Sequence, residues 1–159
     1  MRNCLLALAL AGTAASAQPA PQQLDAAAAQ AIVAGCVRHS SALHHSQAIV
    51  VVDTGGHLIA ALRMDGNGYG SVDFATAKAE AAAAWGFPTA AMAEGARMTS
   101  GFAAAPHVVT VPGGIPVFSA DGRARLGAVG VSGESPADDE ACAEAGVTAA
   151  GFRFAPIGH

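Results

Sequence analysis

The residues best suited to chemistry surround a Gly-Gly pair, where Asp53 and His57 stand four positions apart. A neutral imidazole at an accessible turn can bind a transition metal, although a solvated turn histidine is the simpler interpretation. The Asp53 carboxylate is expected to accept backbone N–H bonds within its own turn. In an enzyme, the same two side chains would serve as the acid–base pair.

Cations are scarce in this chain, which has eight Lys and Arg among 159 residues. Arg63 and Lys78 are candidates for binding the carboxylates of a ligand, Arg63 in bidentate fashion. The alternative is a structural pairing with one of the acids Asp53, Asp65 or Asp73. Met64 offers a soft thioether ligand, or it packs in the core or at its rim.

Further candidates lie elsewhere in the chain. The histidines before the first predicted strand, His39, His44 and His45, could bind a metal at low affinity, but no Cys/His spacing typical of zinc is present, and the alternative is a solvated loop. Gly113 and Gly114 would let the backbone approach a flat ligand closely, or they simply form a turn. Thr110 offers an oxygen ligand just before them.

The N-terminus has the features of a secretory signal peptide. Arg2 supplies the positive charge, residues 4–11 form the apolar stretch, and Ala15-Ser16-Ala17 is a cleavage site. We expect residues 1–17 to be removed and residues 18–23 to form a flexible lead-in. The mature protein is therefore expected to be periplasmic or secreted.

Two cysteines, Cys36 and Cys142, remain after this removal and would meet an oxidising compartment. A disulfide between them would close a loop of about a hundred residues. The alternative is two small buried thiols in separate helices.

Residues 24–159 are predicted to form one domain, because their number suits a single hydrophobic core. Only 13% of all residues are charged and the formal net charge is −4, which leaves no basic surface for nucleic acid. No membrane insertion is predicted once the signal peptide is removed.

Apolar periodicity and turn residues predict the elements of this domain. Helices are expected over 24–38, 72–84 with Ser71 as N-cap, 88–97, and from Ser135 as N-cap to about Ala149. Strands are expected over 48–52, 57–62, 108–111, 115–118 and 124–131. The order α-β-β-α-α-β-β-β-α with short turns predicts an α+β fold, in which a roughly five-stranded antiparallel sheet is flanked by helices.

Several blocks of sequence cover nearly the whole mature chain. They are Val51–Leu58 (VVDTGGHL), Arg63–Gly66 (RMDG), Ser71 with Lys78-Ala79, Pro112–Val117 (PGGIPV), and Gly127–Gly133 (GAVGVSG) followed by Asp138–Glu140. In this order they resemble the GlcG/HbpS-like proteins, which share a domain with the C-terminal part of PduO-type proteins.

The resemblance implies a roughly five-stranded antiparallel sheet flanked by helices, assembly into homo-oligomers, and haem or a related tetrapyrrole as the ligand. His57 then becomes the candidate iron ligand, with Arg63 and Lys78 as candidates for the propionates. The leading hypothesis is an exported haem carrier, buffer or sensor accessory. Two alternatives stay open: an enzyme acting on a small organic acid or aldehyde, and an assembly partner of a periplasmic redox protein.

Overall fold

The structure is a computed structural model that describes residues 23–157. The predicted signal peptide lies outside these residues. The elements follow in the order α1 (Ala26–Ala42), β1 (Ala48–Asp53), β2 (Leu58–Arg63), α2 (Tyr69–Trp85), α3 (Thr89–Met98), the short 3-10 turn η1 (Phe102–Ala104), β3 (Gly114–Phe118), β4 (Arg125–Ser132) and α4 (Pro136–Ala149).

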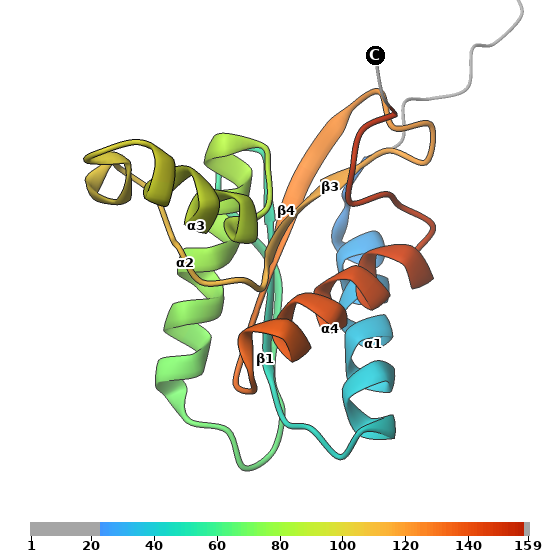
Figure 1. Cartoon of the computed structure of the whole chain (residues 1–159). Helices are drawn as coiled ribbons and strands as arrows, with labels where there is room; N and C mark the ends of the chain where they lie inside the picture. Colours follow the sequence, from blue (N-terminus) through green and yellow to red (C-terminus); the bar gives the residue numbers. More distant parts are fainter. Residues whose placement is uncertain (1–22, 158–159) are drawn as a thin grey trace, which may run out of the picture.

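The strands form one antiparallel sheet in the order β2-β1-β4-β3. Helices α1 and α4 pack on one face of this sheet, whereas α2 packs on the other with α3 beside it (Figure 1). The α+β class and the order of the elements are as predicted, but the described residues hold four strands in place of about five. The predicted strand over 108–111 is wrong, because this stretch pairs with no strand, and strand preference depends on such a neighbour.

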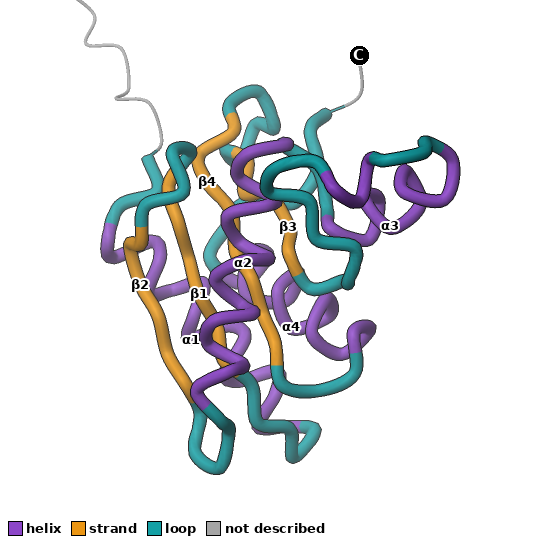
Figure 2. Tube along the Cα trace, turned by 90° about the vertical axis from the view of Figure 1, so that its left-hand side faces the viewer, coloured by secondary structure: helices purple, strands orange, loops and turns teal. Residues whose placement is uncertain are grey.

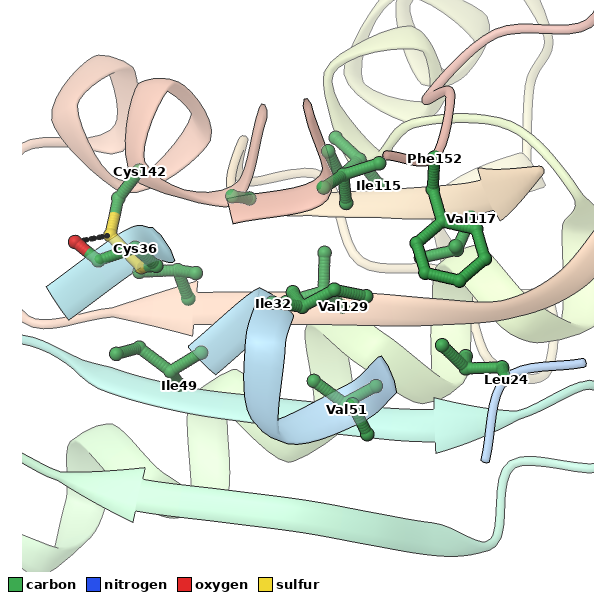
Figure 3. Close-up of a cluster of buried hydrophobic side chains, with 14 residues drawn as sticks. Leu24, Ile32, Cys36, Ile49, Val51, Ile115, Val117, Val129, Cys142 and Phe152 are labelled. Atoms are coloured by element: carbon green, nitrogen blue, oxygen red, sulfur yellow. Dashed lines mark hydrogen bonds between the residues drawn. A yellow bond between two sulfur atoms is a disulfide. The ribbon is translucent and has the colours of Figure 1, made fainter. Parts of the chain in front are cut away.

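The face toward α1 and α4 carries the larger core. Branched and aromatic side chains from α1, the sheet and the segment after α4 meet there, including Ile32, Ile49, Val51, Ile115, Val117, Val129 and Phe152 (Figure 3). At one end of this core a disulfide joins Cys36 of α1 to Cys142 of α4, with the Cα atoms 4.7 Å apart. The two helices are thereby linked covalently.

The opposite face is covered by α2, which presents alanines to the sheet. Ala75, Ala79, Ala82 and Ala83 pack on Val50, Val52 and Ala128. A Cβ atom at Gly130 of β4 would collide with the carbonyl oxygen of Ala75, so glycine permits the helix to lie this close. Small side chains on both elements therefore set the spacing of this layer.

The ends of the helices follow local signals unevenly. Ser135 caps α4 as predicted, with its Oγ accepting from the N–H of Asp138 at 3.2 Å. In contrast, α2 begins three residues earlier than predicted, with Gly68 at its N-cap, so Ser71 lies inside the first turn and is not the cap. Within residues 23–157, no helix combines the length and apolarity needed to span a membrane.

Candidate functional site

The turn between β1 and β2 is organised by the Asp53 carboxylate. Its Oδ1 atom accepts the backbone N–H groups of Gly55 at 2.8 Å and of His57 at 2.9 Å. The His57 N–H, followed by the His57 imidazole and the Gly55 N–H, holds the pKa of the Asp53 carboxyl below its usual value. The carboxylate thus stays ionised through the neutral range and performs the turn-forming role predicted from the sequence.

The His57 imidazole lies against the same carboxylate. Its Nδ1 atom is 3.1 Å from both Asp53 carboxylate oxygens, and the side chain is 82% exposed. When Nδ1 carries the proton shared with Asp53, Nε2 keeps its lone pair and can bind a metal. A Cβ at Gly55 would lie 2.8 Å from His57 Cε1, so the glycine makes room for the ring. This pair has the chemistry of an oriented metal ligand.

A cavity of about 200 Å³ adjoins this turn. Its lining comprises Thr54, Gly55, Gly56, Glu80, Ala84 and His107. Pockets that enclose an organic ligand usually measure about 300–1,000 Å³, so a tetrapyrrole would have to lie across its mouth rather than inside it. The imidazole and carboxylate of the lining still place two further polar groups next to the turn.

Sequence reasoning missed Glu80 and His107. The first lies on α2 and the second on the loop before β3, and no spacing connects either to the Asp53 turn. His107 has one unusual property, a left-handed backbone with φ of 57° in a residue other than glycine. Nothing in the sequence marks this conformation.

A larger concave surface lies between α1 and β2, with a volume of about 560 Å³. Its lining is Gln30, Val33, Ala34, Val37, Arg38, Ile59, Ala60, Ala61 and Leu62. The groove is mostly apolar and contains no histidine or acid. It therefore offers hydrophobic area and one cation, whereas the cavity beside the turn offers the titratable groups.

Arg63 and Met64 lie at the opposite end of β2 from His57. Because a strand rises about 3.3 Å per residue, some 20 Å separates the two ends. Arg63 is exposed and donates from Nη1 to the carbonyl of Asn67, while the backbone N–H of Met64 donates to the Gln47 carbonyl at 3.0 Å. Within one chain, the structure does not bring these residues to the candidate iron ligand.

Lys78 is buried rather than open to a ligand, with 1% of its side chain exposed. Its Nζ donates to Asp139 Oδ2 at 3.0 Å and to the Val131 carbonyl at 2.9 Å, and it lies 4.8 Å from the Phe74 ring centroid. Neither Asp53, Asp65 nor Asp73 is its partner. The ion pair links α2 to α4 across the sheet and has a structural role.

The same buried network continues beyond the ion pair. Asp139 Oδ1 accepts from Gln47 Nε2 at 3.0 Å, and Gln47 Oε1 accepts from the Ser40 hydroxyl. Ser40 Oγ in turn lies 3.0 Å from the sulfur of Cys142. A chain of polar contacts thus runs from the ion pair on α2 to the disulfide.

Close packing against Lys78 and Thr89 explains the two glycines of the predicted turn. Gly113 has a φ of 118°, and a Cβ there would lie 2.8 Å from Lys78 Nζ. Gly114 is buried and donates its N–H to Thr89 Oγ1 at 3.0 Å. Thr110 is exposed on the preceding loop. Both glycines therefore have a structural explanation that needs no ligand.

The three histidines near the end of α1 do not form a site of their own. His39 lies in the last turn of α1, which extends past its predicted end, and His44 has a left-handed backbone with φ of 58°. In the part of the chain that the structure describes, no three His, Cys, Asp or Glu side chains gather closely enough to hold a metal. A metal ion that is already held by an organic ligand needs only one side-chain donor from the protein, which a single histidine can supply.

Solved structures share this architecture. A double mutant of HbpS from Streptomyces reticuli is 28% identical, with a TM-score of 0.74 over 95% of this chain and 99% of that one. The Klebsiella pneumoniae protein ORFY is 25% identical, with a TM-score of 0.73 over 85% and 97%. A complex of PduOC with haem has the same fold at 22% identity, with a TM-score of 0.76 over 84% and 99%.

No curated protein sequence gives a significant match to the chain. A family model described as "Haem degrading protein HbpS-like" does match, over residues 24–148. This range contains the Asp53–His57 turn, the Lys78–Asp139 ion pair and both cysteines of the disulfide. The chain therefore belongs to the HbpS-like family, as its sequence blocks predicted.

Proposed function

We propose that this protein is an exported, homo-oligomeric haem-binding protein that acts as a carrier, a buffer or a sensor accessory. Membership of a haem-related family supports haem as the ligand class. The observation that carries the proposal is the His57 imidazole, which is exposed and fixed through Nδ1 by the Asp53 carboxylate. That arrangement suits a ligand to haem iron, because the carboxylate orients the ring and leaves its other nitrogen free to bind.

The residues around the turn fit a surface-bound tetrapyrrole better than an enclosed one. The cavity beside the turn is small, and the His57 ring lies against Gly55 with 82% of its side chain exposed. Haem bound there would supply an iron centre for redox or gas chemistry, and the chain would supply the imidazole and the polar rim of Glu80 and His107. We assign no propionate contact to Lys78, because Asp139 neutralises its charge.

Export is the second part of the proposal. It rests on the signal-like features of residues 1–17 and on the disulfide between Cys36 and Cys142, since stable disulfides belong to oxidising compartments. Mass spectrometry of protein recovered from the periplasm or the medium should show a chain that starts at or near Gln18. Protein that retains residues 1–17 would contradict this part.

Haemin titration of the mature protein tests the ligand. We expect a Soret shift with defined stoichiometry, and His57→Ala should change the Soret and visible bands because the nitrogen ligand is lost. Asp53→Asn should weaken binding while preserving the nitrogen-ligand spectrum. A control variant, His44→Asn/His45→Ala, removes one exposed and one half-buried imidazole from the other end of the sheet and should bind like wild type.

The outcomes of this titration separate the proposals. A spectrum that changes only in the His44→Asn/His45→Ala variant would move the ligand to the loop before β1. Loss of the Soret band when a reductant is added in the presence of dioxygen, but not in its absence, would indicate haem degradation, the activity named in the family description. The absence of any haemin binding by wild type would contradict the proposed function and favour the enzyme hypothesis.

A further inference from the structure

One edge of the sheet is open. β2 pairs with β1 on one side and with no strand on the other, among the residues that the structure describes. Helix α2 packs over β1, β4 and β3 but not over β2, so this face of β2 is not covered by a helix (Figure 2). The unpaired backbone N–H and C=O groups of such a strand can pair with another chain.

β2 lacks the features that usually block an edge. Its sequence, LIAALR, contains neither Pro nor Lys, and its bulge lies at the end near His57. Leu58 is 65% exposed and Leu62 is 41% exposed. By contrast, β3 at the other edge contains Pro116, is buried throughout, and ends in a bridge between Phe118 and Arg153. Only one of the two edges is therefore suited to pairing.

The apolar groove between α1 and β2 lies along this open edge. Val33 and Val37 form its helix side, and Ile59 and Leu62 form its strand side. A second strand added to β2, with its own helix above it, would cover this groove. An isolated peptide would cover the strand but would leave the helix side of the groove open.

The charges near this edge are unevenly distributed along it. The carboxylate of Asp53, which accepts the backbone N–H groups of Gly55 and His57, lies next to the start of β2. Arg63 ends the strand, and Arg38 lines the groove in the second half of α1. Two copies that meet antiparallel bring the cations of each copy to the anionic end of the other, whereas a parallel meeting would place like charges together.

We infer that a second copy of this chain pairs antiparallel with β2, about a two-fold axis near Ala60 and Ala61. The two sheets then form one continuous sheet, and the two α1 helices meet above it. Such an isologous contact is the usual form of a closed dimer. The pair of chains is the building unit of the proposed homo-oligomer.

This pairing also completes the proposed haem site, and to that extent it rests on the proposed function. Within one chain, Arg63 lies about 20 Å from His57, at the other end of the strand. In the antiparallel pair, Arg63 of the partner subunit comes to the end where His57 lies. Its guanidinium has five donors and gives only one to Asn67, so it can bind a ligand carboxylate.

Sedimentation of the mature protein without haem tests the pairing by itself. Wild type should sediment as a dimer or as a multiple of two chains. Leu58→Glu and Leu62→Glu should both dissociate it, because each places a charge on the contact surface while leaving the core intact. Met98→Glu, which changes a residue that is 79% exposed on α3, should keep the wild-type mass.

Circular dichroism establishes that each variant is folded before its mass is compared. A monomeric wild type would overturn the pairing, and so would folded Leu58→Glu and Leu62→Glu variants that both retain the wild-type mass. Haemin binding by wild type is measured separately and tests the haem part of the proposed function, whereas a monomeric wild type would also contradict its homo-oligomeric part. Conversely, a dimer that binds no haemin would contradict the proposed function and retain the β2 interface.

Subunit mixing tests the shared site. Arg63→Ala should lower haemin affinity about tenfold, the loss of one charge-assisted contact, without altering the spectrum. When Arg63→Ala and His57→Ala chains are unfolded together and refolded, the mixed dimer has one site with His57 from one chain and Arg63 from the other. We expect tight binding with the wild-type spectrum at about half of the sites in these mixed dimers. No recovery on mixing would show that the two residues do not act across the interface.

Discussion

The two faces of the sheet are packed by different means. On the face toward α1 and α4, large aliphatic side chains fill the space and a disulfide joins the helices. On the face toward α2, alanines and a glycine bring backbones together with few side-chain atoms between them. One layer depends on side-chain volume and a covalent link, and the other on small side chains that let the backbones lie close.

This difference in packing determines which α2 side chains lie near the candidate site and which reach α4. The close approach of α2 carries Glu80 next to the turn of Asp53 and His57, and it keeps Lys78 near enough to reach Asp139. The ion pair then ties the alanine layer to the disulfide layer. The cavity beside the turn is therefore lined in part by α2, and small side chains set the position of that helix.

Removal of the disulfide should have the largest effect. Cys36→Ala/Cys142→Ala opens a loop that spans 106 positions. For a loop of that length, the expected loss is about 4–5 kcal/mol of unfolding free energy. Urea unfolding without reductant measures it, and full reduction of wild type provides the matched comparison. An unchanged midpoint would mean that the α1/α4 layer holds together by packing alone.

Lys78→Ala should cost about 3–5 kcal/mol, because it leaves the Asp139 carboxylate buried without its cation. Lys78→Met/Asp139→Asn should cost much less, since the asparagine is neutral and its oxygen can still accept from Gln47 and Glu134. Thermal unfolding of both variants tests this order. A double variant that is no better than the single one would show that the charges themselves are needed to join the two layers.

Gly130→Ala tests the close packing of α2 and should destabilise the protein by about 3 kcal/mol, the upper end of the usual cost of overpacking. The added methyl group would meet the backbone of Ala75 and Ala79, which cannot rotate away as a side chain can. Gly70→Ala is the control, because nothing lies within 4 Å of its added atom. Equal stability of the two variants would contradict the proposed role of backbone contact.

The smallest predicted effect concerns the start of α2. Asp25 and Ser135 cap α1 and α4 with their side chains, but Gly68 provides no such bond for α2. Gly68→Asn has open space and an extended backbone, so it should stabilise the protein by a few tenths of a kcal/mol. Chemical denaturation resolves the gain when compared with Gly68→Ala, which adds a side chain without a capping oxygen. No difference between these two variants would exclude capping as the cause.

Sequence by itself determined the features that depend on near neighbours. The Ser135-Pro136 start of α4, the Asp53 turn and the order of helices and strands follow from caps, turn residues and periodicity. The family also follows from short blocks in a fixed order, and the model match over residues 24–148 confirms it. These signals act within a few residues, so they can be read before the chain is folded.

Only the tertiary structure decided the contacts between distant segments. Residues 108–111 have strand-forming side chains, yet no strand lies beside them in the described part of the sheet. Lys78 has Asp139 as its partner, 61 positions away, and His107 reaches the cavity at the Asp53 turn from another loop. The types and spacing of these residues are compatible with many partners. The packing of α2 on the sheet and the burial that results determine which partner each residue contacts.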